Sequence, residues 1–301
     1  MSFLWKKHLC IVIIFLFIFS FSSSFAQEFE KVEIKTEEAG VGVYVLFGDG
    51  GNIGVCIGDD GALLVDSQFA ELNEKVTAAI AAIKDVPIRY VLNTNWHYDH
   101  VSGNKSLAEG GAIIIAQNDT RKRMIAEQYH PLFDTKVPPY PEAALPTVTF
   151  AKSITLHFNG GEIYVFHIKN AHSDSDIVIH FKNANVLHTG DIIFSSGFPF
   201  IDIPHGGSVN GMIKAVDHLL EMVDEETKII PGHGPLTDRK GLEKYRHLLV
   251  TVRDCVRNQM KEGKTLEEIL ASNPTEGFEK MGIGVPAEMF VTIIYNDLSQ
   301  K

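Results

Sequence analysis

Cysteine is scarce in this sequence, with three residues in 301. So few cysteines cannot form the disulfide framework that holds many small secreted domains together, so a packed core must stabilise the fold. Cys10 lies in an N-terminal segment that we expect to be removed. Cys56 and Cys255 lie in apolar patterns typical of small buried thiols, and neither is spaced as a metal ligand. We therefore expect two free thiols and no bridge between them.

Clusters of basic residues are also missing. Lys and Arg together number 27 against 38 for Asp and Glu, which gives a formal net charge of −11. Nucleic acids and anionic membrane surfaces are bound through clustered Lys and Arg. The composition therefore argues against both as partners and leaves a small-molecule substrate as the expected one. It does not determine the oligomeric state.

The apolar run at the N-terminus is too short to be a typical membrane span. It extends from Leu9 to Phe19, whereas a spanning helix needs about 20 apolar residues. Lys6 and Lys7 precede the run, and Ser24-Phe25-Ala26 follows it with the small-x-small form of a signal peptidase site. We expect residues 1–26 to be a cleaved signal peptide. The mature protein would then be periplasmic or secreted, without stable membrane association.

The rest of the chain contains no repeat and no low-complexity linker, and its first half alternates strands with helices. Apolar runs between Gly-Asp turns predict strands at 41–47, 52–57, 62–66, 88–92 and 112–116. Helical spacing predicts helices at 72–83 and 118–127. The segment 130–146 carries five prolines without periodicity, so we expect a loop there, and whether it closes over a site is left open.

The second half restarts in strands and ends in helices. Strands are predicted at 153–158, 162–168, 176–181, 186–188 and 228–230. Helices are predicted from Ser208 to residue 220 and at 242–256, 265–271 and 287–298. Two similar halves of strands and helices indicate an α/β sandwich with a helical tail.

The residues with the clearest chemistry directly follow the predicted strand 88–92, in the segment Asn95-Trp96-His97-Tyr98-Asp99-His100. Imidazole and carboxylate groups on one loop can point at a common position, and zinc prefers these ligands. Three further candidates also lie on turns that follow apolar runs: His172, Asp191 and His233. Because strand-end loops gather the sites of α/β folds, we expect all of them to converge.

These residues in this order resemble the metallo-β-lactamase superfamily, over Gly40 to Pro235. The resemblance implies a four-layer αββα sandwich at 27–238, followed by a C-terminal helical extension at 239–301. It also implies one or two zinc ions. His97 and His172 would hold the first, and Asp99, His100 and His233 the second. Asp191 would bridge the two, and Asp99 would act in catalysis by orienting a water or passing its proton.

One position departs from the family pattern, because Asn95 stands where the first His of His-x-His-x-Asp-His is usual. An amide oxygen is a weak zinc ligand, so Asn95 would contribute little to the first site. We expect the second site to bind more tightly, and a mononuclear resting state stays open. The mono-zinc lactamase subclass also has Asn here, but pairs it with a Cys at the position of Asp191.

Other polar residues have weaker support. His188 is near Asp191 and is a candidate for supporting the ligands, as is Asp66, which matches a superfamily aspartate behind the metal loop. His205 follows the apolar stretch 194–201 and is a candidate substrate contact. The remaining histidines within strand and helix patterns are expected to be structural, namely His157, His167, His180, His218 and His247.

Several functions fit this ligand set. The leading hypothesis is hydrolysis of a lactam, amide or ester by metal-activated water, and a β-lactamase is one form of it. The absence of a Lys soon after Asp191 weakens that form. A glyoxalase II-like thioesterase is expected to have basic residues in the C-terminal helical extension, where Lys240, Lys244 and Arg246 are the local candidates. An iron-dependent oxidoreductase acting on sulfur compounds and a degenerate binding protein are the remaining alternatives.

Overall fold

The computed structural model describes residues 29–278 and 284–300. The predicted signal peptide lies outside these residues. Among the residues that are described, no helix has the length and apolar character to cross a membrane.

The first of two main sheets has seven strands in the order β1-β2-β3-β4-β5-β6-β9. β1 to β4 form an antiparallel meander, and β4, β5, β6 and β9 run parallel. β4 is buried along its whole length because both faces of the sheet are covered. The strands are β1 (Lys35–Gly40), β2 (Val43–Phe47), β3 (Ile53–Gly58), β4 (Gly61–Val65), β5 (Ile88–Asn93), β6 (Ile113–Gln117) and β9 (Val148–Phe150).

The second sheet has five strands in the order β10-β11-β12-β13-β14. Its strands pair antiparallel except β13 and β14, which are parallel. The strands are β10 (Ser153–Phe158), β11 (Gly161–His167), β12 (Ile177–Phe181), β13 (Val186–His188) and β14 (Lys228–Ile230).

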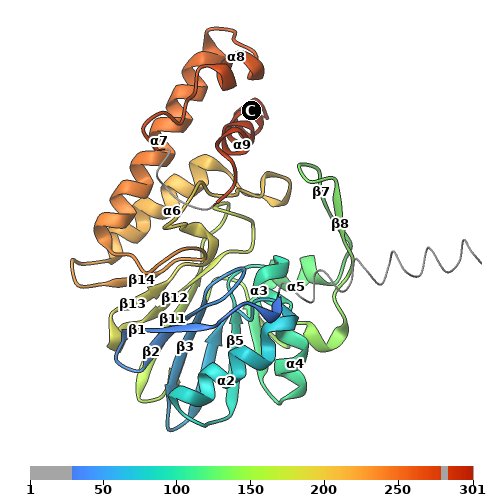
Figure 1. Cartoon of the computed structure of the whole chain (residues 1–301), viewed down its shortest axis with the longest axis vertical. Coiled ribbons are helices and arrows are strands. Elements are labelled where there is room, and N and C mark those ends of the chain that lie inside the picture. The colour runs from blue at the N-terminus through green and yellow to red at the C-terminus, as the bar shows by residue number, and fades with distance from the viewer. Residues whose placement is uncertain (1–28, 279–283, 301) are drawn as a thin grey trace, which may run out of the picture.

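The two sheets pack face to face, with helices on both outer faces (Figure 1). Between the sheets lies an apolar core that includes Val45 and Val65 from one sheet and Val165 and Ile179 from the other. A second core joins the outer face of the first sheet to α2 and α4. The helices of this half are α2 (Asn73–Ile83), α3 (Tyr98–Val101), α4 (Asn104–Glu109) and α5 (Asn118–Met124). The expected four-layer αββα sandwich is thus confirmed.

The C-terminal helices complete the outer layer of the second sheet. One core cluster contains Leu187 and Ile229 of that sheet together with Met212, Leu248 and Phe290 of the helices. The residues named as tail therefore share a core with the sandwich. The helices are α6 (Val209–Met222), α7 (Arg239–Lys261), α8 (Leu266–Ala271) and α9 (Ala287–Ser299). Ser208, Asp238 and Thr265 cap α6, α7 and α8 with side-chain oxygens.

The expected loop at 130–146 is only partly correct. A small hairpin opens it, formed by β7 (Gln128–His130) and β8 (Thr135–Val137), which stands away from the sheets (Figure 1). These two strands are mostly polar and exposed, so no apolar run marks them in the sequence. Cys56 and Cys255 are free thiols, as expected.

Candidate metal centre

The predicted ligands meet at one edge of the sandwich because the strands before them all end there. His97, Asp99 and His100 follow β5, Asp191 follows β13 in a 3-10 turn, and His233 follows β14. His172 precedes β12, which runs antiparallel to β13, so it comes to the same edge. The backbone N–H of Ile177 donates to the carbonyl of Thr94 and so ties the two sheets together at this point.

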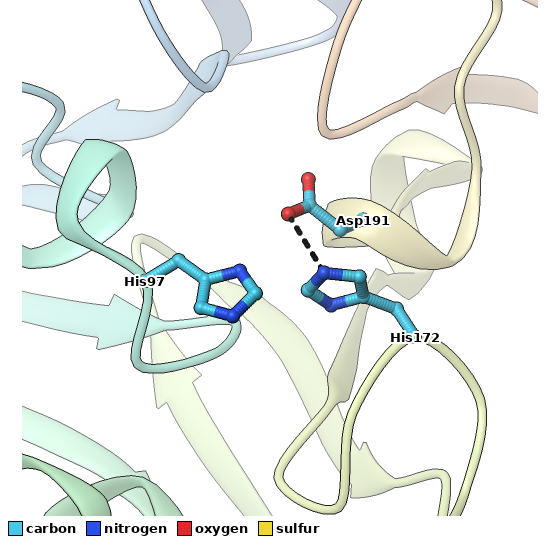
Figure 2. A group of neighbouring side chains, drawn as sticks. All are labelled: His97, His172 and Asp191. Carbon is cyan, nitrogen blue, oxygen red and sulfur yellow. Dashed lines mark ion pairs between the residues drawn. The ribbon is translucent and has the colours of Figure 1, made fainter. Parts of the chain in front are cut away.

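One group of candidate ligands consists of His97, His172 and Asp191, whose ligand atoms lie within 4.8 Å of one another. Figure 2 shows the two imidazoles and the carboxylate turned toward a common space. Asp191 Oδ2 lies 3.6 Å from His172 Nε2. These are the residues expected to hold the first metal.

The second group consists of Asp99, His100 and His233. Asp99 Oδ2 lies 3.2 Å from His233 Nε2 and 3.5 Å from His100 Nε2. Asp191 reaches this group too, because its Oδ2 is 3.2 Å from His100 Nε2 and its Oδ1 is 3.4 Å from His233 Nε2. Asp191 thus lies between the two groups, as a bridging ligand would.

Unpartnered buried atoms test whether these residues fit a metal ion. Eleven buried side-chain atoms of the described residues lack a hydrogen-bond partner, and His100 Nε2, His172 Nε2 and Asp191 Oδ1 are among them. Buried polar atoms normally have partners, because leaving one unpaired costs about 1–3 kcal/mol. All three belong to the candidate ligand set, and their donor chemistry is that of a zinc site. The residues therefore fit the metal that the fold implies.

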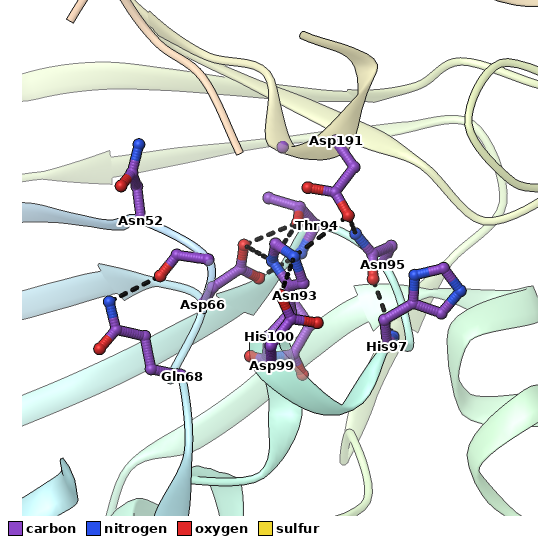
Figure 3. A network of polar contacts seen from close by, with 12 residues as sticks. Asn52, Asp66, Gln68, Asn93, Thr94, Asn95, His97, Asp99, His100 and Asp191 are labelled. Atoms are coloured by element: carbon purple, nitrogen blue, oxygen red, sulfur yellow. Dashed lines mark hydrogen bonds and ion pairs between the residues drawn. The ribbon is translucent and has the colours of Figure 1, made fainter. Parts of the chain in front are cut away.

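Each buried histidine is oriented by a carboxylate behind it. His100 Nδ1 is 2.8 Å from Asp66 Oδ2, and His172 Nδ1 is 3.1 Å from Asp176 Oδ1. An ionised carboxylate only accepts hydrogen bonds, so each Nδ1 must donate, which leaves Nε2 free to ligate. Thr94 holds Asp66 through its backbone N–H at 2.7 Å and its hydroxyl at 2.6 Å (Figure 3).

The His97 ring uses its two nitrogens in the opposite way. Its Nε2 donates to Asp202 Oδ2 at 2.8 Å, which leaves Nδ1 free to ligate a metal in the first group. Together with His130, His97 and Asp202 form a third cluster of metal-ligating types. The direct contact between His97 and Asp202 has the length of a hydrogen bond, so we interpret Asp202 as the partner that sets the ring's orientation.

Asn95 has an orientation that does not favour the weak ligation predicted for it. Its Oδ1 accepts from the backbone N–H of His97 at 2.8 Å, which identifies the other amide atom as nitrogen. That nitrogen donates to Asp191 Oδ2 at 3.2 Å (Figure 3). An amide nitrogen is no metal ligand, so Asn95 positions Asp191 and the His97 backbone in this arrangement.

The carboxylates make the centre strongly attractive to cations. Burial by itself would lower the pKa of the histidines, but Asp191 and Asp176 raise the pKa of His172 to about 9. Asp191, Asp99 and Asp66 likewise raise the pKa of His100 well above its usual value. Conversely, burial would raise the pKa of Asp99, and the charges of His100 and His233 lower it instead. Metal ions and protons would therefore compete for the same atoms.

Glycine is required where backbone passes close to these ligands. A Cβ at Gly232 would lie 2.1 Å from Asp191 Oδ1, and one at Gly51 would lie 2.4 Å from His100 Cε1. Gly190, directly before Asp191, has φ +51°, a left-handed conformation that favours glycine.

His188 and His205, expected to support the ligands and to contact substrate, are not members of the two ligand groups. His188 is buried behind the centre, where its Nδ1 accepts from the Gly190 N–H at 3.3 Å, and burial lowers its pKa to about 4. His205 is buried and bonds Asp202 at 2.7 Å, so its contact with substrate stays a prediction.

Sequence reasoning missed three contributors to the site, namely His130, Asp176 and Asp202. His130 stacks on Trp96 with ring centroids 5.2 Å apart, and burial lowers its pKa to about 4. An aspartate within an apolar stretch is the one signal that could have drawn attention to Asp202.

Comparisons with known proteins agree with this geometry. A family profile described as the metallo-beta-lactamase superfamily matches residues 46–233. A hydroxyacylglutathione hydrolase from Pelagibacter ubique is 30% identical over 152 residues, which cover 50% of this chain and 53% of that protein. A probable metallo-hydrolase from Bacillus subtilis is 24% identical over 154 residues, 49% of this chain and 69% of that one. The chain thus spans about half to two thirds of the length of these curated relatives.

Solved structures share the fold at low sequence identity. A metallo-beta-lactamase from Pontibacter korlensis superposes with a TM-score of 0.59 and 17% identity, covering 72% of this chain and 99% of that one. A sec-alkylsulfatase from Pseudomonas sp. superposes with a TM-score of 0.62 and 18% identity, covering 90% of this chain and 51% of that one. Because the profile matches more than half of its length, the chain belongs to the metallo-β-lactamase superfamily.

Proposed function

We propose that this protein is a zinc-dependent hydrolase that attacks the carbonyl carbon of an ester or thioester, with Asp191 shared between two metal positions. The observation that carries the proposal is the place of Asp191, whose two oxygens lie 3.2 to 3.6 Å from histidine nitrogens of both groups. A carboxylate so placed can fix the separation of two ions. Paired ions typically stand about 3.5–4 Å apart in hydrolytic sites.

When bound, zinc would supply a water of lowered pKa and a positive charge for the oxygen of the substrate. The chain's own residues would do the rest. Asp99 is ionised, because its pKa is held below its usual value, and its side chain is 25% exposed. It can therefore accept a hydrogen bond from the attacking water and orient it. The complete burial of His100 and His172 keeps bulk water from their ligating atoms.

The residues after Asp191 favour esters and thioesters over lactams. Ile192 and Ile193 are buried, and Phe194 stacks on His233 with ring centroids 4.9 Å apart. None of them offers a cation for a lactam's carboxylate. The relatives named as hydroxyacylglutathione hydrolases also support thioester chemistry, although they match only about half of their own length here. Lactam hydrolysis is therefore the second candidate.

The proposal is tested by elemental analysis of protein purified without added metal, followed by turnover assays before and after zinc addition. The substrates are 4-nitrophenyl acetate, an S-hydroxyacyl-glutathione thioester and a chromogenic cephalosporin. We expect one to two zinc per chain and zinc-dependent turnover of an ester or thioester. Asp99→Asn should lower kcat by about 100-fold or more even at zinc concentrations that restore the full metal content of the variant. Turnover of the cephalosporin alone would favour the second candidate, and iron with no hydrolysis would contradict the proposal.

We also propose that the mature protein acts in the periplasm or outside the cell. The support is the sequence pattern of residues 1–26 alone. Intact mass of the exported protein tests this, because cleavage after Ala26 predicts a chain that begins at Gln27. An exported chain that still carried residues 1–26 would contradict cleavage.

A further inference from the structure

A cavity of about 480 Å³ lies beside the candidate metal centre. Three parts of the chain that are distant in sequence form its walls: the β7–β8 hairpin with His130 and Leu132, the segment 200–204, and α9 with Ile293 and Asn296. Figure 1 shows the hairpin standing on the same side of the molecule as α9. The volume falls within the range of small-molecule sites, about 300–1,000 Å³.

The inner wall of this cavity touches the ligands of the first group. The ring centroid of Phe200 lies 5.9 Å from that of His97 and 6.1 Å from that of His172. Asp202, also part of the wall, accepts the hydrogen bond from His97. A substrate whose reacting carbon lies at the metal centre would therefore have its neighbouring atoms beside Phe200.

Within residues 29–278 and 284–300, the lining lacks the charges that an anionic ligand would need. No lysine or arginine of this described part of the chain lines the cavity. Arg246, one of the basic residues considered for a glutathione-type substrate, pairs instead with Asp217 on α6. Asp202 is the ionised residue of the wall, and its two oxygens are taken by His97 and His205.

Apolar surface extends from the cavity onto the hairpin. Leu132 is 37% exposed and Phe133 is 47% exposed, and the Phe133 ring lies 5.4 Å from that of Phe200. Exposed apolar side chains gathered at the mouth of a cavity are typical of a surface that binds a ligand.

We infer that this cavity binds an uncharged, apolar acyl group of the substrate, with the scissile carbonyl directed past Phe200 to the metal centre. This inference rests on the proposed function and narrows its substrate class. Acyl chains of several carbons would be preferred over acetyl, and acyl groups that end in a carboxylate would be rejected.

Three S-methyl thioesters test the inference with the zinc-loaded protein: the acetyl, pentanoyl and glutaryl compounds. The small leaving group makes the acyl chain the largest apolar part, and glutaryl matches pentanoyl in length but ends in a carboxylate. Burying three methylenes should raise kcat/KM for pentanoyl over acetyl by about tenfold or more. Glutaryl should fall below pentanoyl by a similar factor, because its charge would lose water without gaining a partner.

Two matched variants on α9 test whether the preference for longer acyl chains arises in this cavity. Asn296 is exposed and lines the cavity, whereas Glu288 is exposed on the same helix and does not line it. Asn296→Trp should narrow the cavity and remove the advantage of pentanoyl over acetyl. Glu288→Trp should keep the advantage. Asn296→Arg should raise glutaryl turnover relative to pentanoyl.

The outcomes separate this inference from the proposed function. Zinc-dependent turnover without chain-length preference, or a preference that survives Asn296→Trp, overturns the inference and leaves the hydrolase standing. Absence of turnover with every ester and thioester overturns the hydrolase. Ligand-observed NMR with hexanamide, a neutral unreactive amide, tests the cavity without turnover. Binding to the wild type and to Glu288→Trp but not to Asn296→Trp supports the inference, and no binding to the wild type overturns it.

Discussion

Replacing Asp66 by Asn should weaken one metal site selectively. Asp66 is fully buried, has φ +69°, and accepts hydrogen bonds from Thr94 and His100. Asn adopts this left-handed conformation readily, so the backbone should tolerate the change. One amide oxygen can still accept from the Thr94 backbone N–H, but the amide nitrogen then faces His100 Nδ1.

The magnitude follows from the imidazole tautomer. Two donors cannot face each other, so His100 Nδ1 must become an acceptor and the proton must move to Nε2, the atom that would ligate the metal. Loss of such an outer partner typically weakens metal affinity by about 10–100-fold, which is about 1.4–2.7 kcal/mol. The loss should fall on the site formed by Asp99, His100 and His233.

Zinc titration against a chromophoric chelator measures both binding steps. Asp176→Asn is the matched control, because Asp176 orients His172 of the other group in the same way. We expect Asp66→Asn to weaken the tighter step and Asp176→Asn the weaker one. Weakening of the same zinc-binding step by both variants would refute the reasoning. So would an Asp66→Asn variant that urea unfolding shows to be folded and whose two zinc affinities both stay within about twofold of the wild type.

Three further predictions concern the site and the fold. Asn95→His should add an imidazole to the first group and tighten the weaker zinc step by about tenfold or more in the same titration. Gly211→Ala should lower the free energy of unfolding in urea by about 2–3 kcal/mol, because its Cβ would lie 1.5 Å from the carbonyl oxygen of Asn170. His188 is buried, and burial lowers its pKa to about 4. Between pH 6.5 and 4 its side chain therefore binds a proton in the unfolded state but not in the folded state. Stability should fall by about 3 kcal/mol over that window on account of this residue, and His188→Asn should reduce the measured fall by about that amount.

Controls make these predictions refutable. Gly110→Ala meets nothing closer than 3.3 Å and should change stability by less than about 0.5 kcal/mol, so equal losses at both glycines would contradict the steric account. A pH-dependent fall in stability that His188→Asn does not alter would contradict the burial argument. If Asn95→His left the weaker zinc affinity unchanged, the lack of an imidazole at position 95 would not be the cause of weak binding at the first group.

Strong periodic patterns allowed most of the fold to be predicted. The apolar stripe of α7 and the Ser208 cap of α6 appear where expected, because amphipathic spacing and caps are local properties of the sequence. β1 was missed, since its sequence KTEEAG is mostly exposed and polar, and its strand conformation comes from pairing with β2. β9 was missed because only Phe150 of its three residues is buried, so the segment shows no apolar run.

The candidate ligands could be predicted because they gather on strand-end loops in a family order, whereas their supporting partners could not. Asp202 contacts His97 across 105 positions of the chain, and no local pattern records such a contact. The hydrogen bonds of Asn95 likewise depend on the packing of Asp191 from the other half. Residues that orient ligands are set by tertiary structure, so only the folded chain identifies them.

Anomalous diffraction at the zinc absorption edge, on crystals of protein purified without added metal, tests the central claim most directly. The account predicts a peak about 2.0–2.2 Å from ligand atoms of Asp99, His100, His233 and Asp191, and at higher zinc a second peak beside His97 Nδ1, His172 and Asp191. No peak among these residues, or one held by His130 and Asp202 instead, would contradict it.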